Sequence, residues 1–413
     1  MDQPVVAAGG RTGSAPEIAI VGGGIGGLAA DAFLHRAGLR STVYEQAAEL
    51  REVGAGLVVA PNAARLLRRL GVLDAFARRA VRLDVGWEFR RWRDGTVLSA
   101  EDLAAACERL YGEHTYTAHR ADLLDVITSA VPAASISLGR RCTGLDIAGR
   151  RPRLRFEDGR TVEADVVIGA DGTHSIVRGT LHGPTPATYS GLCAFRALVP
   201  AGQAPAIARR PAQTLWIGPG HHLVHYPVSA GTLVNLVAFA PAGEYSVESW
   251  SATGTVSEFL AEFDGWDPRL AGLIRAGGTP GRWALLDRPP LQRWSVGPVT
   301  LLGDAAHPMF PFFGQGAAQA IEDAAVLAGV SLTAARIRSG PCTVMRNSGS
   351  LAPAGYRNSA TRGRTSTTCP TDRSSKPETS PTARPTRWSP TDGSTNTTRT
   401  PRLRARLSRS WRR

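Results

Sequence analysis

One part of this 413-residue chain has the residue types and spacing needed to hold a dinucleotide. Gly22, Gly24 and Gly27 follow an apolar strand predicted at 18–21 and precede a helical pattern. The first glycine permits a tight turn, the second lets the backbone approach a pyrophosphate, and the third lets helix and strand pack closely. The N-terminus of the helix offers N–H groups and a positive dipole end to the phosphates.

An acidic residue completes this unit. A second strand, predicted at 41–44, ends at Glu45, about 20 residues after the glycines, where a ribose-binding carboxylate is expected. A carboxylate would repel a 2′-phosphate, so FAD or NAD is favoured here over NADP. The alternative is a glycine-rich turn in an ordinary βαβ unit, and the complete strand–turn–helix–strand–Glu pattern argues against it.

Two further acidic motifs each follow a predicted strand. Asp171-Gly172 comes after an apolar run at 166–168, with Arg178 seven positions beyond the aspartate. Gly303-Asp304 follows another apolar run and leads through a Pro- and Gly-rich turn into a helix predicted to begin near Gln315. A carboxylate at the C-terminal end of a parallel strand is well placed to accept hydroxyl protons from a bound cofactor. A plain NAD dehydrogenase needs neither motif.

Residues 183–282 have a strand-like pattern, with a hairpin predicted over 222–240. His222 and Tyr226 are four positions apart on one strand and therefore point to the same face, whereas His225 is expected on the opposite face. Histidine can deprotonate a phenol near neutral pH, so His222 is the candidate base. A structural sheet histidine is the alternative interpretation.

Together the three glycine and acid motifs resemble the class A flavoprotein aromatic hydroxylases, with the salicylate hydroxylase and 3-hydroxybenzoate 6-hydroxylase subgroup as the nearest. Segments 54–63 and 119–127 also look like family segments, and the resemblance extends from about Ile18 to Leu327. It implies an α/β fold: a Rossmann-like FAD-binding domain of the glutathione-reductase type with an inserted β-rich substrate domain. The predicted FAD-binding domain comprises 17–80, 111–182 and 283–330, the substrate-binding domain comprises 81–110 and 183–282, and 331–413 form a tail.

The resemblance also implies roles for matching positions. Glu45 would bind the adenosine ribose, Arg120 would approach the FAD pyrophosphate, and Asp304 would bind the ribityl chain. Asp171 and Arg178 would serve FAD placement and the approach of NAD(P)H.

The turn before the last predicted helix has a separate predicted role. Gly314, Gln315 and Gly316 precede the helix N-terminus, which would stabilise negative charge on the reduced flavin. A turn that simply needs positive φ is the alternative for the two glycines, and both needs can coexist.

The charge of the chain lies mostly in its last residues. The formal net charge is +13, but 17 of the 48 basic residues and only 3 of the 35 acidic ones lie at 335–413, so the rest is nearly neutral. Residues 346–400 are rich in Ser, Thr, Pro and Arg and have no apolar periodicity, which predicts disorder. If the underlying gene is read in the shifted frame that starts at the third base of each codon, three segments of the tail can become ordinary folded-protein patterns. We therefore hypothesise a frameshift between about Ala328 and Thr333, with a genuinely disordered basic tail as the alternative.

The function predicted is an FAD-dependent, NAD(P)H-consuming monooxygenase that hydroxylates a phenolic or other electron-rich aromatic compound through a flavin C4a-hydroperoxide. NADH and NADPH both stay open as co-substrate. A flavin epoxidase or halogenase is the alternative within enzymes, and an FAD-binding remnant inactivated by the altered tail is the alternative outside them. We expect no metal site, no nucleic-acid partner, and a monomer or a homodimer. No apolar run could span a bilayer, so no membrane partner is expected either. The five cysteines form no CxxC or disulfide-like pattern, which favours a cytoplasmic location.

Overall fold

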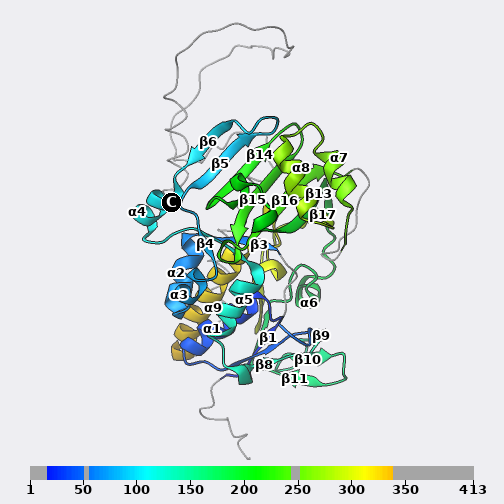
Figure 1. Ribbon diagram of the computed structural model, residues 1–413. Helices are drawn as coiled ribbons and strands as arrows, with labels where there is room; N and C mark the ends of the chain where they lie inside the picture. Colours follow the sequence, from blue (N-terminus) through cyan, green and yellow to red (C-terminus); the bar gives the residue numbers. More distant parts are fainter. Residues whose placement is uncertain (1–15, 51–54, 243–251, 338–413) are drawn as a thin grey trace, which may run out of the picture. The chain divides into compact units, whose positions relative to one another are not determined.

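The computed structural model describes residues 16–50, 55–242 and 252–337 of the chain (Figure 1). The predicted tail therefore lies outside the described residues from position 338 onward. The last described helix continues to Ile337, past the domain boundary predicted at 330.

A six-stranded sheet is built around β1, which pairs in parallel with β2 on one side and β12 on the other. All of its pairings are parallel except the one between β18 and β19 at one edge. A parallel sheet needs helical crossovers, and strands covered on both faces are apolar, as in the Ile-Ala-Ile-Val of β1. The strand order is β18 (Ser295–Val296), β19 (Val299–Leu301), β12 (Val166–Gly169), β1 (Ile18–Val21), β2 (Ser41–Tyr44) and β8 (Ile136–Ser137).

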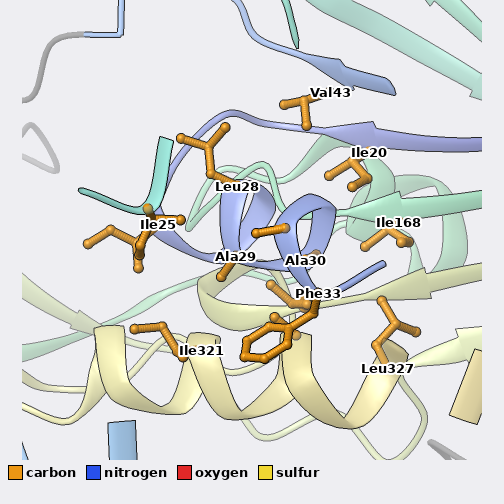
Figure 2. Close-up of a cluster of buried hydrophobic side chains, with 14 of the residues drawn as sticks. Ile20, Ile25, Leu28, Ala29, Ala30, Phe33, Val43, Ile168, Ile321 and Leu327 are labelled. Atoms are coloured by element: carbon orange, nitrogen blue, oxygen red, sulfur yellow. The ribbon is translucent and has the colours of Figure 1, made fainter. Parts of the chain in front are cut away.

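Helix α1 (Ile25–Arg36) is buried along most of its length, because it is covered by strands on one side and by α9 (Gly316–Ile337) on the other (Figure 2). Leu28 packs toward the strands, while Phe33 packs against the α9 side chains Ile321 and Leu327. A helix that is apolar around its circumference is the kind that a core requires. The other helices of this part are α2 (Pro61–Leu70), α3 (Leu73–Ala77), α4 (Leu103–Tyr111), α5 (Arg120–Thr128) and α6 (Ile176–His182).

Asp31 is the one carboxylate among the buried residues of α1, and its contacts explain its presence. Its side chain accepts hydrogen bonds from the hydroxyls of Ser41 and of Ser135, the latter at 2.5 Å. Burial raises the pKa of Asp31, against the effect of these two hydrogen bonds. Asp31 therefore fastens α1 to the start of β2 and to the turn before β8.

Two small sheets flank this core. The first has the order β3 (Gly56–Val59), β7 (Tyr116–His119) and β4 (Val81–Arg82), and the second has β11 (Thr161–Glu163), β10 (Arg153–Phe156) and β9 (Cys142–Asp146). All pairings in both sheets are antiparallel.

A seven-stranded sheet carries the central part of the chain and includes the predicted hairpin. Its pairings are antiparallel except for the one between β14 and β5. Two helices, α7 (Val256–Glu262) and α8 (Pro268–Ala276), lie where the sequence pattern over 183–282 was interpreted as strand-like, so that prediction was wrong for these segments. The strand order is β17 (Gly281–Asp287), β13 (Thr188–Pro200), β16 (Leu233–Pro241), β15 (His222–Val228), β14 (Ala212–Ile217), β5 (Gly86–Arg91) and β6 (Val97–Glu101).

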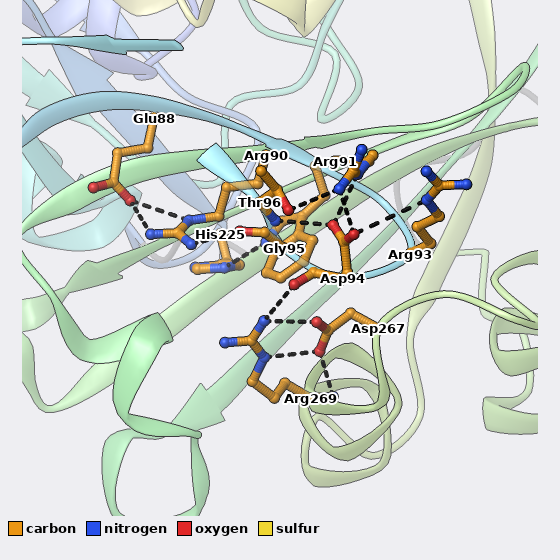
Figure 3. A network of polar contacts seen from close by, with 11 residues as sticks. Glu88, Arg90, Arg91, Arg93, Asp94, Gly95, Thr96, His225, Asp267 and Arg269 are labelled. Atoms are coloured by element: carbon orange, nitrogen blue, oxygen red, sulfur yellow. Dashed lines mark hydrogen bonds and ion pairs between the residues drawn. The ribbon is translucent and has the colours of Figure 1, made fainter. Parts of the chain in front are cut away.

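The two faces of this sheet pack differently. One face joins α7 and α8 in a core that includes Trp216 and Phe259. A polar network supports that side, in which Arg269 of α8 binds Asp267 and the carbonyl oxygen of Asp94 (Figure 3). The other face packs against Val58 of β3 and against Phe310 and Phe312, which precede α9. We call this second face the aromatic face.

The β15–β16 hairpin is anchored at its tip to the helical part of the chain. Ser229 and Ala230 have φ of +48° and +52°, the left-handed conformation that tight hairpins require. The Ala230 N–H donates to the carbonyl oxygen of Arg79 at 2.7 Å, and the Ser229 hydroxyl donates to Asp122 at 2.8 Å. Nearby, the Gly56 N–H donates to Asn235 Oδ1 at 2.8 Å. These bonds fix β15 relative to β3 and α5.

Candidate active site

The glycine-rich turn between β1 and α1 leaves space for a ligand at one position only. Gly22 has φ of +106°, and a Cβ there would lie 2.4 Å from the carbonyl oxygen of Ala170. A Cβ at Gly27 would lie 1.9 Å from the Gly22 carbonyl oxygen. A Cβ at Gly24 would meet no atom of the described residues within 4 Å. The open space beside Gly24, at the N-terminus of α1, suits a pyrophosphate.

Glu45 lies at the end of β2 beside this turn, as the spacing predicts. Its Oε2 accepts a hydrogen bond from the Gly23 N–H at 2.6 Å, and its Oε1 accepts one from the Ala47 N–H at 2.8 Å. The carboxylate is thus held in place by backbone donors, and its remaining lone pairs can accept ribose hydroxyls.

Asp171 has a structural use that the sequence did not indicate. Its carboxylate accepts hydrogen bonds from the Ser175 hydroxyl at 2.5 Å and from the Ile176 and Val177 N–H groups at 2.8 and 3.2 Å. It therefore satisfies donors at the start of α6. Burial raises the pKa of Asp171, against the effect of these hydrogen bonds. Its predicted role toward FAD and NAD(P)H stays a prediction.

Arg178 connects two of the predicted motifs. It is buried, and its guanidinium donates to the carbonyl oxygens of Ala305 and Asp304 at 3.0 and 3.3 Å and also to that of Thr173. Arg178 thus joins the segment after Asp171 to the backbone around Asp304. This observation supports a role in shaping the site.

The residues between β19 and α9 place a carboxylate beside the α9 N-terminus. Asp304 Oδ1 lies 3.9 Å from where a Cβ of Gly316 would be. Gly314 has φ of +62° and packs against Val58, so a side chain there would be strained. Gln315 Oε1 accepts a hydrogen bond from Asn62 Nδ2 at 3.3 Å. The site therefore lies where β1, β3 and α9 approach one another.

Arg120 starts α5, and its N–H donates to the carbonyl oxygen of Ala55 at 2.9 Å. Its positive charge contributes to lowering the pKa of Arg196 on β13, although burial of Arg196 is the larger cause. The two guanidinium groups are thus close enough to interact. The predicted role of Arg120 toward the FAD pyrophosphate stays a prediction.

His222 and Tyr226 lie on the aromatic face of β15, on one side of the strand as predicted. The His222 ring stacks on Phe239 with a centroid distance of 4.5 Å, and Phe312 meets it edge-on at 5.6 Å. Burial lowers the pKa of His222 to about 4, assisted by the charge of His221. Burial raises the pKa of Tyr226 to about 12, against the effect of Arg196. At neutral pH, His222 is a proton acceptor and Tyr226 is a hydrogen-bond donor.

A pocket of about 300 Å³ lies beside His222. It is formed by the facing ends of β14 and β15 and the turn between them: Leu215, Ile217, Gly218, Gly220, His221 and His222.

His225 and Cys193 lie on the face opposite to His222. His225 Nε2 accepts a hydrogen bond from Trp216 Nε1 at 3.0 Å, and Cys193 is fully buried in the core beneath α7 and α8. The cysteine therefore does not line the aromatic face. Burial lowers the pKa of His225 to about 3, with Arg90 contributing.

The two histidines of β15 predict how stability depends on pH. Both are neutral when folded, and both would be protonated below about pH 6.5 in the unfolded chain. The contribution of these two histidines to the free energy of unfolding is thus complete above pH 6.5. It falls as the pH drops toward 4, by up to about 1.4 kcal/mol per pH unit for each histidine. Urea unfolding between pH 7.5 and 5 measures this slope. His225→Gln, which keeps an acceptor for Trp216, should reduce it, and an unchanged slope would contradict the assignment.

Arg196 is a site residue that the sequence analysis missed. It lies on β13 between Ala194 and Leu198, which both belong to the aromatic face, and its guanidinium lies 5.0 Å from the Trp283 ring centroid. The mutual influence of Arg196 and Tyr226 on their pKa values shows that the two are close. Arg196 faces inward within the otherwise apolar run Cys193–Val199 of β13. A charge in such a run is costly unless it is used, so this residue was the available signal in the sequence.

The nucleotide-binding residues fit FAD. The space beside Gly24 suits the pyrophosphate, Glu45 is positioned for the ribose, and Asp304 presents a carboxylate to which no described residue donates a hydrogen bond. Dinucleotide-binding α/β proteins use these positions in this way. The fold and the site thus define a flavoprotein whose second sheet has an aromatic face.

Comparison with known proteins agrees with this class. A family profile described as "FAD binding domain" matches residues 16–258 and 282–335, and the chain belongs to this family. It is 44% identical over 326 residues to a 3-amino-4-hydroxybenzoate 2-monooxygenase of Streptomyces platensis, covering 79% of this chain and 82% of that protein. It is 37% identical to a 6-hydroxynicotinate 3-monooxygenase of Pseudomonas fluorescens, covering 76% and 82%.

Solved structures show the same architecture. Klebsiella pneumoniae HpxO, complexed with FAD and uric acid, superposes with a TM-score of 0.72 at 27% identity, covering 84% of this chain and 89% of that one. A salicylate hydroxylase substrate complex gives a TM-score of 0.69 at 25% identity, covering 84% and 87%. The chain is an FAD-dependent monooxygenase of the aromatic hydroxylase type.

Among the helices of residues 16–50, 55–242 and 252–337, none has the length and apolar character needed to cross a membrane. Within the same ranges, no three His, Cys, Asp or Glu side chains are grouped so as to hold a metal ion.

Proposed function

We propose that this protein hydroxylates a phenolic aromatic carboxylate, with NADH or NADPH as electron donor. The observation that carries the proposal is the neutral, aromatic-sandwiched His222 on the face that also presents Tyr226 and Arg196. The names of the relatives support it, because 3-amino-4-hydroxybenzoate and 6-hydroxynicotinate each combine a ring hydroxyl with a carboxylate.

When bound and reduced by NAD(P)H, FAD would supply the activation of O₂, of which one oxygen atom is transferred to the ring and the other leaves as water. The protein's contribution begins with His222, whose imidazole accepts the phenolic proton. A base with a pKa of about 4 is weak, but an anionic substrate beside it raises that pKa again. Deprotonation of the phenol makes the ring more electron-rich at the positions that are attacked.

The other side chains of the aromatic face orient the ring and exclude water. Phe239 and Phe312 contact His222 and each other, with a centroid distance of 5.1 Å, so they provide apolar walls for an aromatic ring. Tyr226 stays protonated and can donate to a substrate oxygen. The Arg196 guanidinium suits a carboxylate, which it can bind with two parallel N–H donors.

Arg196 should therefore decide how well the carboxylate is recognised. We expect Arg196→Met to raise KM for a hydroxybenzoate by about 10- to 100-fold, because a charged hydrogen-bonded pair is lost. The phenol without a carboxylate should lose little, since it never used the guanidinium. Equal losses for both compounds would show that Arg196 supports the fold rather than the substrate.

The experiment for the proposed function is a substrate screen on the full chain. The flavin absorbance spectrum of the purified protein is recorded first, and NADH and NADPH oxidation is then measured with 3-amino-4-hydroxybenzoate, 6-hydroxynicotinate, 3-hydroxybenzoate and salicylate. Stimulated oxidation with one oxygen atom incorporated into the product supports the proposal. Yellow protein that no aromatic acid stimulates would contradict it, and colourless protein would support an inactive remnant.

Two finer properties belong to this proposal. Use of NAD(P)H favours the cytoplasm, where that donor is available, and the free buried Cys107, Cys142 and Cys193 are consistent with a reducing compartment. The oligomeric state, a monomer or a homodimer, stays a prediction.

A further inference from the structure

A buried histidine–aspartate pair lies behind the loop that carries Asp304. His307 Nε2 is 2.6 Å from Asp323 Oδ2, and the two side chains are 2% and 9% exposed. Asp323 belongs to α9, so the pair connects the loop to that helix. The Trp294 ring packs on the imidazole with a centroid distance of 4.9 Å.

The same pair also holds the start of the loop. Asp323 Oδ2 accepts a hydrogen bond from the Gly303 N–H at 3.0 Å, and the Gly303 carbonyl oxygen accepts one from the His307 N–H at 2.9 Å. Gly303 has φ of +58°, a left-handed conformation that glycine adopts readily. The segment Gly303–His307 is thus closed at both ends by these two residues.

The middle of the loop is held from the same side. Arg178 donates to the carbonyl oxygens of Asp304 and Ala305, which fixes the backbone and leaves the Asp304 side chain on the side of Gly316. Supporting residues of this kind set how accurately a ligand-binding group is placed.

The charges around His307 come from two elements. Asp323 of α9 is in direct contact, and Asp304 lies three residues before His307 within Coulomb range. Burial opposes protonation of His307, but these two carboxylates outweigh it, so the pKa of His307 is raised above its ordinary value. Because an ionised carboxylate can only accept hydrogen bonds, His307 Nε2 is the donor to Asp323.

We propose that His307 and Asp323 are a positioning pair for FAD, which sets the affinity for the cofactor by holding the Asp304 loop in place. Neither residue needs to touch the flavin. The inference rests on the assignment of Asp304 to the FAD site, which is part of the proposed function.

The test measures the dissociation constant of FAD from the full-length protein by fluorescence quenching, together with the melting temperature. His307→Leu and Asp323→Asn should each weaken FAD binding by about 10- to 100-fold, the range for loss of a hydrogen bond to a charged group. The matched control is Leu154→Ala in β10, a fully buried residue of a different sheet. It should lower the melting temperature but leave FAD affinity within a factor of two.

A second variant separates the hydrogen bond from the shape of the ring. Gln at position 307 can still donate to Asp323, whereas Leu cannot. His307→Gln should therefore bind FAD at a level between wild type and His307→Leu.

Three results would overturn the inference. His307→Leu or Asp323→Asn could bind FAD as wild type does, or His307→Gln could bind FAD no better than His307→Leu. Asp304→Ala, measured in parallel, could also leave FAD affinity unchanged, which would show that Asp304 does not hold FAD. The proposal would then fail together with that assignment, whereas unaltered His307 variants beside a weakened Asp304→Ala would refute the pair alone.

Discussion

His222→Asn is expected to slow hydroxylation by about 100- to 10,000-fold while FAD stays bound, which is the range for removing a general base. Asparagine is polar and of similar size, so it can occupy the space between Phe239 and Phe312. It cannot accept the phenolic proton, and the bound phenol would stay neutral. NAD(P)H oxidation should continue with hydrogen peroxide as product, because flavin reduction does not need this proton acceptor.

The chain offers a matched control on the same strand. His225 is three residues away, on the other face of the sheet, where its Nε2 accepts from Trp216. His225→Gln should therefore leave the rate of hydroxylation per bound FAD almost unchanged, even if the protein is less stable. Product yield per NAD(P)H oxidised, measured at saturating substrate for both variants, separates the two roles.

The outcome that would refute this role is a parallel loss. If His222→Asn reduced FAD binding as much as it reduced hydroxylation, or if both rates stayed at the wild-type level, His222 would be a structural residue of the sheet. Raising the pH to ionise the substrate itself offers a further check, since a phenolate needs no base. The variant should then recover part of its activity, and the wild type should gain little.

The second large effect concerns the glycine turn. Gly24→Ala should weaken FAD binding by about 100-fold or more, because its methyl group would occupy the space beside the α1 N-terminus. The FAD-free protein should keep its melting temperature, since φ of Gly24 is −74° and no described atom lies within 4 Å of the added carbon.

Gly27→Ala is the contrasting variant. Its methyl carbon would lie 1.9 Å from the carbonyl oxygen of Gly22, so β1 and α1 would have to separate. We expect misfolded protein or a large loss of thermal stability whether or not FAD is present. Circular dichroism melting curves with and without FAD distinguish the two glycines, and equal behaviour of the variants would contradict the assignment of the open space to the pyrophosphate.

The nucleotide site was largely predictable because its residues are close in sequence. The strand 18–21, the turn at Gly22–Gly27, the helix after it and Glu45 form one continuous unit, and the local backbone dictates their geometry. The alternation of side chains on a strand likewise predicted that His222 and Tyr226 share a face and that His225 lies on the other. Helices α7 and α8 were missed although their sequences carry helix signals: Thr255 and Glu258 form a capping box before α7, and the buried residues Leu270, Leu273 and Ile274 of α8 are spaced i, i+3, i+4.

What the sequence by itself determined is the cofactor class and the chemistry of individual side chains, since both follow from local motifs. Only the tertiary structure decided which distant residues meet: Phe312 against His222, Arg196 beside Tyr226, and Asp323 on the backbone of Gly303. It also showed that Asp171 accepts hydrogen bonds from the start of α6 and that Cys193 lies away from the aromatic face. The physical reason is that burial, pKa and pairing are properties of the neighbours in space, and these come from strands and helices far apart along the chain.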